Sequence, residues 1–300
     1  MSNSVSIRRA AVIGFGEAGA ILGADLAHTG AAVATYDILL DAAATRPALL
    51  ARAATAGVRA ADTLADALVG AELVISAVTA ASAIDVARQC AALLRSGQWF
   101  LDINSVSPDV KRGNAAAIEA AGAAYVEAAV MAPVPPHRLK VPMLLGGARA
   151  ATLAAALTAL GMNVSVVSAA VGVASAIKMC RSVMIKGLEA LAVECLFAAR
   201  HYGAEAEVLA SLDRSFPGMG WGRELPDYLI SRVAEHGRRR AAEMREVAAT
   251  VAAAGVEPLM SAAAGRRQDE LVERMAAAGR TYDDGAVFSW RELADALSVR

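Results

Sequence analysis

The sequence predicts an α/β amino-terminal domain with a doubly wound, mostly parallel sheet, followed by an all-α carboxy-terminal domain. Two observations support this prediction. Up to about residue 168, short apolar runs alternate with helical segments, whereas beyond it one helical segment follows another. The chain has 300 residues, which is enough for two domains with separate hydrophobic cores. We therefore expect a first domain over residues 1–168 and a second, beginning with a long helix, over residues 169–300.

The first βαβ unit carries a glycine-rich turn. An apolar strand over 10–13 leads directly into the turn, a helix follows to about His28, and a second strand over 32–36 ends at Asp37. Glycines allow a tight turn, and the amino terminus of the following helix presents backbone N–H groups to a pyrophosphate. A GxGxxG pattern between a strand and a helix therefore predicts a Rossmann-type dinucleotide site. Its predicted cofactor contacts are Gly14, Phe15, Gly16, Glu17, Ala18 and Gly19.

Asp37 predicts which dinucleotide binds. A carboxylate at the end of the second strand accepts hydrogen bonds from the ribose hydroxyls of the adenosine and repels a 2′-phosphate. The sequence has no arginine between Asp37 and Arg46 to receive such a phosphate. NAD is therefore favoured over NADP. An alternative role for Asp37 is to cap a helix, although Asp41 is better placed for that role.

The alternation of strands and helices continues through the first domain. We expect strands over 73–78 and 99–103 and helices over 82–94 and 108–121. In a parallel sheet of this kind the ligand lies at the carboxyl ends of the strands. Ser107 falls at such an end but equally suits the N-cap of the following helix. The further predicted cofactor contacts are Val78, Thr79 and Asn104.

A polar stripe runs along the segment from Gly172 to Gly203. At about 100° per residue, the polar residues share one face of a helix whose remaining surface is mostly apolar. A helix that is apolar almost all round is normally buried, and buried lysines without partners are costly. The stripe therefore either faces acidic partners in the core or lines a cleft that binds a polar ligand. Its members are Ser175, Lys178, Ser182, Lys186 and Glu189.

Three segments in order resemble the β-hydroxyacid dehydrogenases, the family of 3-hydroxyisobutyrate and tartronate semialdehyde enzymes. They are the glycine-rich turn with Asp37, DINSVSP at 102–108 and GVASAIK at 172–178. The second is similar to the family's D-x-S-T-x-S-P substrate loop, and the third to its G-x-G-x-x-x-K-x-x-N-N helix. The resemblance implies that Lys178 is the catalytic group of an NAD(P)-dependent dehydrogenase. More narrowly, VMAPVPPHRLKVP and SVMIKGLEAL resemble a divergent, 6-phosphogluconate dehydrogenase-like branch with its own carboxy-terminal helical domain.

The sequence also departs from the family pattern. Arg181 and Ser182 stand where the family has two asparagines after the lysine. The segment 131–133 replaces the family's Ser-Gly-Gly, which usually holds the substrate carboxylate. Arg181 and Lys186 are additional cations that could replace the lost contacts. The predicted substrate contacts are Ser105, Val106, Met131, Ala132, Pro133, Arg181 and Lys186.

Hydride transfer needs a group that moves a proton at the reacting oxygen. When an alcohol is oxidised, its hydroxyl proton must be removed as hydride leaves for the nicotinamide, and the reverse reaction must protonate the carbonyl oxygen. Desolvation in an apolar cleft disfavours the charged form of a lysine, which suits this role. We therefore predict Lys178 as general acid/base, with Ser182 as its orienting partner and Lys186 as second choice.

Two other functions remain open. The altered segment 131–133 could serve a reductase that acts on imines or on a bulky or aromatic alcohol. The chain could also be a non-catalytic dinucleotide-binding module that kept the fold. Lys178 at the family's spacing argues against this second alternative, because an inactive protein has no need of a buried lysine.

The second domain is predicted to consist of consecutive helices separated by loops rich in glycine and proline. Within it, the charge-dense segment 236–246 predicts a solvated helix face with local pairs, such as Arg240 with Glu243 or Glu246. The many alanines and leucines of this half indicate packing between subunits, and we expect a homodimer. The predicted helices cover residues 205–213, 224–253, 258–277 and 287–298.

Composition excludes several classes of partner. The formal net charge of −1 predicts no binding to nucleic acid or to an anionic membrane, and no segment resembles a bilayer span or a signal peptide. The four histidines are scattered away from acidic clusters, so we expect no metal. Cys90, Cys180 and Cys195 are odd in number and lack metal-ligand spacing. We therefore expect a reduced, cytoplasmic protein that acts on a small molecule.

Overall fold

The chain divides into two compact units, Met1–Lys178 and Met179–Arg300. The structure, a computed structural model, describes residues 6–283 and 285–298. The division therefore falls within the long helix that carries Lys178, whereas the sequence predicted a boundary after residue 168. The outer ends of both predicted domains, residues 1–5 and 299–300, lie outside the described residues.

In the described part of the first unit, eight strands form one sheet. They are β1 (Arg9–Ile13), β2 (Ala32–Tyr36), β3 (Arg59–Ala60), β4 (Leu73–Ser76), β5 (Trp99–Asp102), β6 (Ala124–Val130), β7 (Met143–Gly146) and β8 (Val164–Ser168). Their order is β3-β2-β1-β4-β5-β6-β7-β8, and every neighbouring pair is parallel except β6 with β7. The predicted doubly wound, mostly parallel sheet is therefore confirmed.

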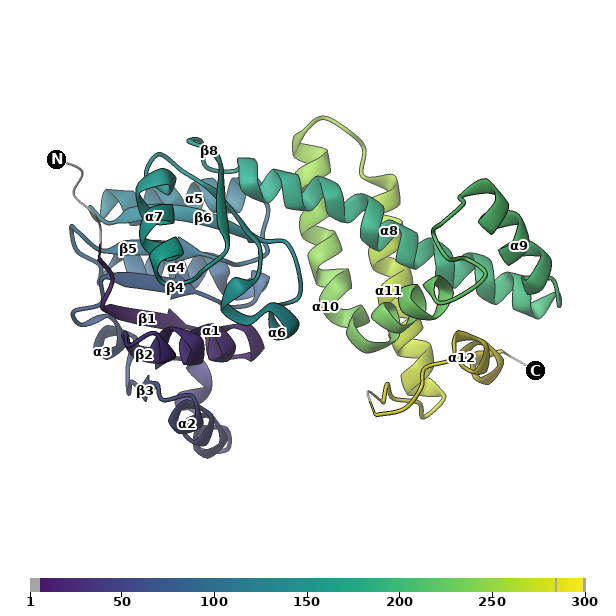
Figure 1. The fold of residues 1–300 in the computed structure, drawn as a ribbon, viewed down its shortest axis with the longest axis horizontal. Coiled ribbons are helices and arrows are strands. Elements are labelled where there is room, and N and C mark those ends of the chain that lie inside the picture. The colour runs from purple at the N-terminus through teal and green to yellow at the C-terminus, as the bar shows by residue number, and fades with distance from the viewer. Residues whose placement is uncertain (1–5, 284, 299–300) are drawn as a thin grey trace. The chain divides into compact units, whose positions relative to one another are not determined.

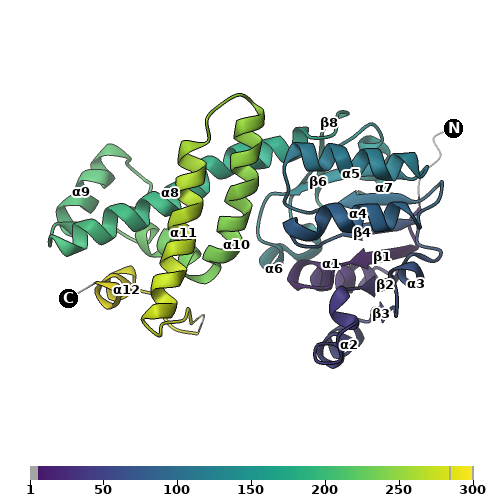
Figure 2. The same cartoon turned by 180° about the vertical axis from the view of Figure 1, so that it is seen from behind.

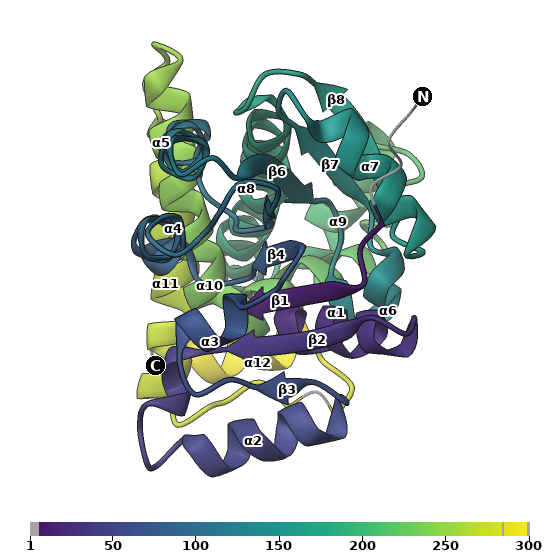
Figure 3. The same ribbon diagram turned by 90° about the vertical axis from the view of Figure 1, so that its left-hand side faces the viewer.

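Helices cover both faces of this sheet (Figures 1 and 2). Figure 3 shows α4 and α5 on one face, with α1 and α7 on the other. Each face has its own apolar core, built around Leu22 and Leu153 on one side and around Cys90 and Ile118 on the other. The helices are α1 (Glu17–His28), η1 (Ile38–Leu40), α2 (Arg46–Thr55), α3 (Leu64–Leu68), η2 (Ala80–Ser82), α4 (Ala83–Ala91), α5 (Pro108–Ala120), α6 (Val134–His137), η3 (Arg138–Lys140) and α7 (Ala150–Ala159).

Strands buried on both faces read as continuous apolar runs, which is why the sequence located them. The predicted strand over 32–36 agrees with β2 at both ends. The strand predicted over 73–78 instead ends at Ser76. Ala77 donates its N–H to the carbonyl of Ile13 at 2.8 Å, and the chain then leaves the sheet toward the glycine-rich turn. This early exit brings the ends of β1 and β4 together.

The described residues of the second unit form only helices. They pack around a core that includes Leu196, Ile230, Leu271 and Trp290. α10 and α11 lie side by side (Figure 2), and the predicted all-α carboxy-terminal domain is confirmed. None of the described helices is both long enough and apolar enough to cross a membrane. The helices are α8 (Val173–His201), which begins in the first unit, α9 (Glu205–Ser215), α10 (Leu225–Ala253), α11 (Leu259–Ala277) and α12 (Trp290–Leu297).

The burial of α8 differs from the prediction. The polar stripe is the buried face, since Lys186 is 7% and Glu189 1% exposed. The apolar face is open, since Met184 is 73% and Leu191 52% exposed. The expectation of a helix buried all round is therefore wrong for a single chain. The physical reason is that α10 covers the polar stripe through ion pairs, together with apolar neighbours such as Met179 and Val193, whereas the face of Met184 and Leu191 is exposed.

Candidate active site

The glycine-rich turn joins β1 to α1 at the carboxyl edge of the sheet. Gly14 has φ +89°, and a Cβ there would lie 2.5 Å from the carbonyl oxygen of Ala77 and 2.8 Å from Cγ1 of Val78. Only glycine fits this position. A Cβ at Gly16, the N-cap of α1, would meet no atom within 4 Å. Open space therefore lies before the amino terminus of α1, where backbone N–H groups and the helix dipole favour a diphosphate.

Asp37 fastens this turn to the end of β2. One carboxylate oxygen accepts the N–H of Phe15 at 2.7 Å, and the other accepts the N–H of Leu39 at 2.9 Å. Asp37 is thus the N-cap of η1, whereas Asp41 accepts a hydrogen bond from the Tyr36 hydroxyl at 2.8 Å. The expectation that Asp41 is the better-placed cap is wrong. A capping side chain must directly precede its helix to reach the second N–H, and only Asp37 does.

Asn104 bridges the ends of β4 and β5. Its Oδ1 accepts the N–H of Val78 at 2.7 Å, and its Nδ2 donates to the Ser76 hydroxyl at 2.9 Å. Both ends of the amide therefore bind the protein, and Asn104 fixes the loop that carries Val78 and Thr79. The Thr79 side chain is exposed and lies 3.1 Å from the Ser82 hydroxyl.

Ser105 lies next to this bridge. Its hydroxyl oxygen is buried, and it has no hydrogen-bond partner within the described part of the chain. Buried hydroxyls nearly always have a partner, so this one is available to a ligand. The neighbouring Val106 is buried, and Ser107 occupies the N-cap position of α5.

A buried network under Asn104 centres on Asp102. Its Oδ1 accepts from the Asn104 N–H at 3.0 Å and from Lys111 Nζ at 2.8 Å, while its Oδ2 accepts from Asn114 at 3.1 Å and from the Tyr125 hydroxyl at 2.9 Å. Burial, followed by the Asp102 charge, holds the pKa of Tyr125 well above its ordinary value, so the phenol stays a donor. The buried charge of Asp102 is therefore fully hydrogen-bonded, as burial requires.

Glu127, in the middle of β6, holds the start of α8. This buried carboxylate accepts N–H groups from Gly172 at 2.7 Å, from Ala174 at 3.1 Å and from Ser175 at 3.3 Å. These are the N–H groups that a helix leaves without internal partners at its amino terminus. On the neighbouring strand β7, a Cβ at Gly146 would collide with the same carboxylate. Glu127 therefore anchors the helix that carries Lys178 to the sheet.

The sequence analysis did not select Glu127, Asp102 or Lys111 as site residues. A signal was present, because each is a charged residue within or beside a buried apolar segment and needs a partner. It also missed Arg52, whose Nη1 donates to the carbonyl of Phe15 at 3.1 Å. That contact joins α2 to the glycine-rich turn, but nothing in the sequence around Arg52 distinguishes it from a surface arginine.

The remaining predicted residues have less defined surroundings. Lys178 is half-buried, one turn beyond the capped start of α8, and its side chain has an interaction partner. Ser182, one turn further along α8, is buried, and Arg181 is exposed. Met131 and Ala132 are half-buried and Pro133 is exposed, in the connection from β6 to α6.

In the second unit, α8 and α10 share two buried ion pairs. Lys186 pairs with Glu243, and Glu189 accepts from Arg240 Nη1 at 2.8 Å. Gln268 of α11 donates to the backbone carbonyl of Lys186 at 3.3 Å. Lys186 therefore has the acidic partner that was one of the two alternatives for the polar stripe. The solvated face predicted for the segment 236–246 is wrong at Arg240, because its side chain is only 13% exposed and pairs with Glu189 of α8. Local pairing of Arg240 with Glu243 or Glu246 stays a prediction.

A search of the described residues finds no group of three or more histidines, cysteines, aspartates or glutamates that could hold a metal ion.

The fold and the glycine-rich turn define the class of this protein, which has a Rossmann-type dinucleotide-binding domain followed by a helical domain. Residues 9–172 match the NAD binding domain of 6-phosphogluconate dehydrogenase, and the chain belongs to this family. Residues 199–271 match a domain of unknown function, DUF1932. The predicted relationship, including a distinct carboxy-terminal helical domain, is confirmed.

Solved structures agree with this assignment. A conserved hypothetical protein from Sinorhizobium meliloti 1021 is 39% identical, with a TM-score of 0.77 over 98% of this chain and 97% of its own. A conserved protein described as structurally similar to 3-hydroxyacid dehydrogenases is 32% identical, with a TM-score of 0.71 over 88% of this chain and 97% of its own. The 3-hydroxyisobutyrate dehydrogenase of Mycobacterium tuberculosis shares the fold at 20% identity, with a TM-score of 0.71 over 98% and 100%. The relationships support an oxidoreductase of the dehydrogenase type with a nicotinamide dinucleotide cofactor.

The buried pairs of α8 predict a specific pH dependence of stability. Burial raises the pKa of Glu189 to about 7, although Arg240 and Lys186 act to lower it. The folded protein then binds more protons than the unfolded chain between about pH 4.5 and pH 7, so its free energy of unfolding falls as the pH rises through that range. In Glu189→Gln we expect this fall to be smaller by about 3 kcal/mol.

Urea unfolding at pH 5 and pH 8, followed by tryptophan fluorescence, measures this difference. Glu207→Gln is the matched control, because Glu207 is an exposed glutamate on α9. An equal pH slope in wild type and Glu189→Gln would contradict the raised pKa.

Proposed function

We propose that this protein is an NAD-dependent oxidoreductase of the β-hydroxyacid dehydrogenase type, with Lys178 as general acid/base. The observation that carries the proposal is the glycine-rich turn, whose open position at Gly16 faces the amino terminus of α1. Family membership supports a dehydrogenase, and the GVASAIK segment, by its resemblance to the β-hydroxyacid dehydrogenase helix, puts Lys178 in the place of the catalytic lysine. The bound cofactor supplies the hydride chemistry, and the protein supplies position and proton transfer.

The residues around the turn fit a dinucleotide. Gly14–Gly19 would hold the diphosphate, and Val78, Thr79 and Asn104 would position the loop on the neighbouring strand. Asp37 has one hydrogen bond to each carboxylate oxygen from the protein, which leaves further acceptor sites for ribose hydroxyls. Its negative charge favours NAD over NADP, because a 2′-phosphate would lie beside a carboxylate.

The proposed substrate contacts are side chains whose hydrogen-bonding groups or charges are available to a ligand. Ser105 offers a buried hydroxyl without a described partner, and Val106 and the segment 131–133 would shape an apolar wall. Arg181 is exposed and could bind a substrate carboxylate. Lys186 would first have to leave Glu243. We therefore assign the first contact with a substrate anion to Arg181, with Lys178 at the reacting oxygen and Ser182 orienting it.

Lys178→Met tests the proton-transfer role. We expect turnover to fall by roughly 10²–10⁴-fold, the usual contribution of a general acid/base, while NADH affinity changes little. Nicotinamide absorbance reports turnover and NADH fluorescence reports binding. The assay would use β-hydroxy acids, aryl-substituted alcohols, imines and the matching carbonyls.

Lys140→Met is the control for this experiment, because Lys140 is exposed on η3. Turnover that survives in Lys178→Met would move the proton transfer to another group, with Lys186 the next candidate. Preference for imines or bulky aryl alcohols would instead favour the reductase alternative. Tight NADH binding by a wild type that turns over no substrate would favour a non-catalytic module.

Asp37→Asn tests the choice of cofactor. Removing the charge while keeping the shape weakens ribose binding and relieves repulsion of a 2′-phosphate. We expect the ratio of NADP to NAD affinity to rise about tenfold, measured by fluorescence titration of NADH and NADPH. Asp41→Asn, at an exposed position four residues later, should leave the ratio unchanged. An unchanged ratio in Asp37→Asn would mean that Asp37 serves only the turn.

We also propose a cytoplasmic homodimer that covers the apolar face of α8. Ile177, Met184 and Leu191 recur every seven residues along this helix, and all three are exposed. Such a seven-residue repeat packs well against a second helix. The described cysteines are free, which suits a reducing compartment.

Light scattering measures the assembly directly. We expect a mass of twice 30.7 kDa for wild type and a shift toward one chain for Met184→Glu combined with Leu191→Glu. Val256→Glu, an exposed apolar position in the loop between α10 and α11, is the control. A monomeric wild type would overturn the dimer.

A further inference from the structure

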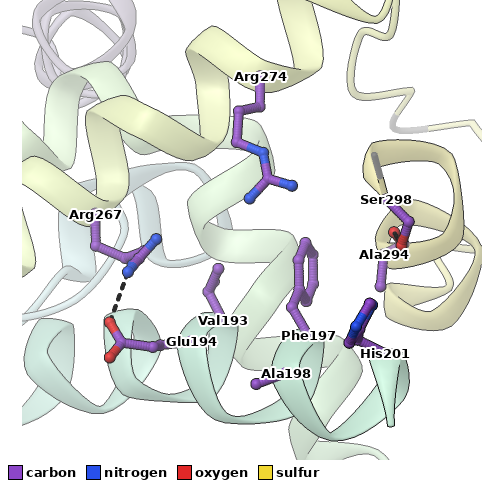
Figure 4. A pocket seen from close by; sticks show the side chains of 9 residues that line it. All are labelled: Val193, Glu194, Phe197, Ala198, His201, Arg267, Arg274, Ala294 and Ser298. Atoms are coloured by element: carbon purple, nitrogen blue, oxygen red, sulfur yellow. Dashed lines mark hydrogen bonds and ion pairs between the residues drawn. The ribbon is translucent and has the colours of Figure 1, made fainter. Parts of the chain in front are cut away.

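A pocket lies entirely within the helical unit. It has a volume of about 350 Å³, and Figure 4 shows its walls, which come from the last turns of α8, from α11 and from α12. This volume is at the small end of ordinary ligand sites. Phe197, at one wall, follows Ser182 by 15 residues, or ~22 Å along α8. The pocket is therefore separate from the residues proposed to act on the substrate.

Two arginines of α11 supply cationic groups to this pocket. Arg267 and Arg274 are seven residues apart, which places them on one face of the helix, and both extend toward α8 (Figure 4). Arg274 donates to the backbone carbonyl of Leu297 at 2.8 Å. A guanidinium has five N–H donors, so Arg274 has capacity for a further acceptor. His201 adds an imidazole at the end of α8.

The charges around the pocket disfavour a ligand with more than one negative charge. Arg267 donates to Glu194 at 2.7 Å and also pairs with Glu270. Glu270 lies 3.8 Å from Arg274, so two carboxylates already balance two guanidinium groups. A dianion would add repulsion from both acidic groups. A monoanion needs only Glu194, whose side chain is 66% exposed, to turn into solvent.

The remaining wall is apolar. Val193 and Ala294 are buried, and the ring of Phe197 is half-buried between α8 and the arginines (Figure 4). Arg267 also has a buried Nε with no hydrogen-bond partner among the described residues. A buried donor of this kind costs free energy unless a ligand or water accepts from it. The pocket thus combines an apolar surface with a buried guanidinium N–H, at Arg267 Nε, that has no described partner.

We propose that this pocket binds a small monocarboxylate with an aryl or branched-alkyl body. The carboxylate accepts hydrogen bonds from Arg274 and Arg267, and the body packs on Phe197, Val193 and Ala294. Planar carboxylates match the guanidinium fork, and planar rings stack on both phenyl and guanidinium groups. This site is separate from the residues proposed for hydride transfer, and binding to it does not depend on the proposed activity.

Calorimetric titration with benzoate, phenyl phosphate, inorganic phosphate and benzyl alcohol tests the assignment on the full chain. We expect saturable benzoate binding, and weaker binding of phenyl phosphate, of inorganic phosphate and of the neutral alcohol. Arg274→Met should raise the benzoate dissociation constant about tenfold or more, as the loss of a charge-assisted pair predicts. Arg266→Met, at an exposed arginine of the same helix outside the pocket, should leave it unchanged.

Ala198→Trp provides a second variant that removes no hydrogen bond. Ala198 lines the pocket from an exposed position, so the indole fills the space without disturbing the core. We expect benzoate binding to be lost while NADH binding is kept. Absence of benzoate binding by wild type, equal binding in Arg274→Met or Ala198→Trp, or tighter binding of phenyl phosphate or benzyl alcohol than of benzoate would each overturn the proposal.

Discussion

The buried carboxylate of Glu127 is the constraint on which the arrangement of the first unit depends. A charge in the middle of a sheet is tolerated only when hydrogen bonds and dipoles satisfy it, and the start of α8 supplies three N–H groups. The same carboxylate needs a glycine beside it at position 146 on β7. One side chain therefore fixes the neighbouring strand and sets the position of the first turns of α8, including Lys178. The backbone of Lys178 is therefore positioned by a helix whose start is hydrogen-bonded to the sheet.

The loops at the carboxyl edge of the sheet depend in the same way on buried polar groups. After β5, the buried Asp102 carboxylate holds the loop, because it accepts hydrogen bonds from the N–H of Asn104 and from the ammonium of Lys111. The side chain of Asn104 in turn accepts the N–H of Val78 and so holds the loop after β4. Asp37 does the same for the glycine-rich turn. Loops that would otherwise be mobile are held at three strand ends, which suits a ligand that touches all of them.

Local chemistry made much of this fold predictable from sequence. Continuous apolar runs located the buried strands. The turn after β1 was recognisable because few backbone arrangements need glycine at both positions 14 and 19. Partners distant in sequence were not predictable, since Glu127 and the N–H of Gly172 are 45 residues apart. The burial of α8 was also mispredicted. Apolar composition indicates that a helix face avoids water, but it does not indicate whether residues of the same chain cover that face. The pairing of Arg240 with Glu189 was not predicted for a related reason, because helical spacing describes neighbours on one helix and not those on the helix packed against it.

The central position of β1 has a consequence for how the chain is made. β1 is synthesised before β4, yet one of its edges pairs with β4, where Ala10 lies opposite Leu73. At the usual rates of translation, the ribosome needs roughly 3–12 s to add those 63 residues. During that interval β2 can cover one edge of an apolar strand while the other stays open to foreign strands. The nascent chain is therefore most vulnerable to misassociation early, before either apolar core of the sheet has closed. A chaperone that shields short apolar strands would act at that stage.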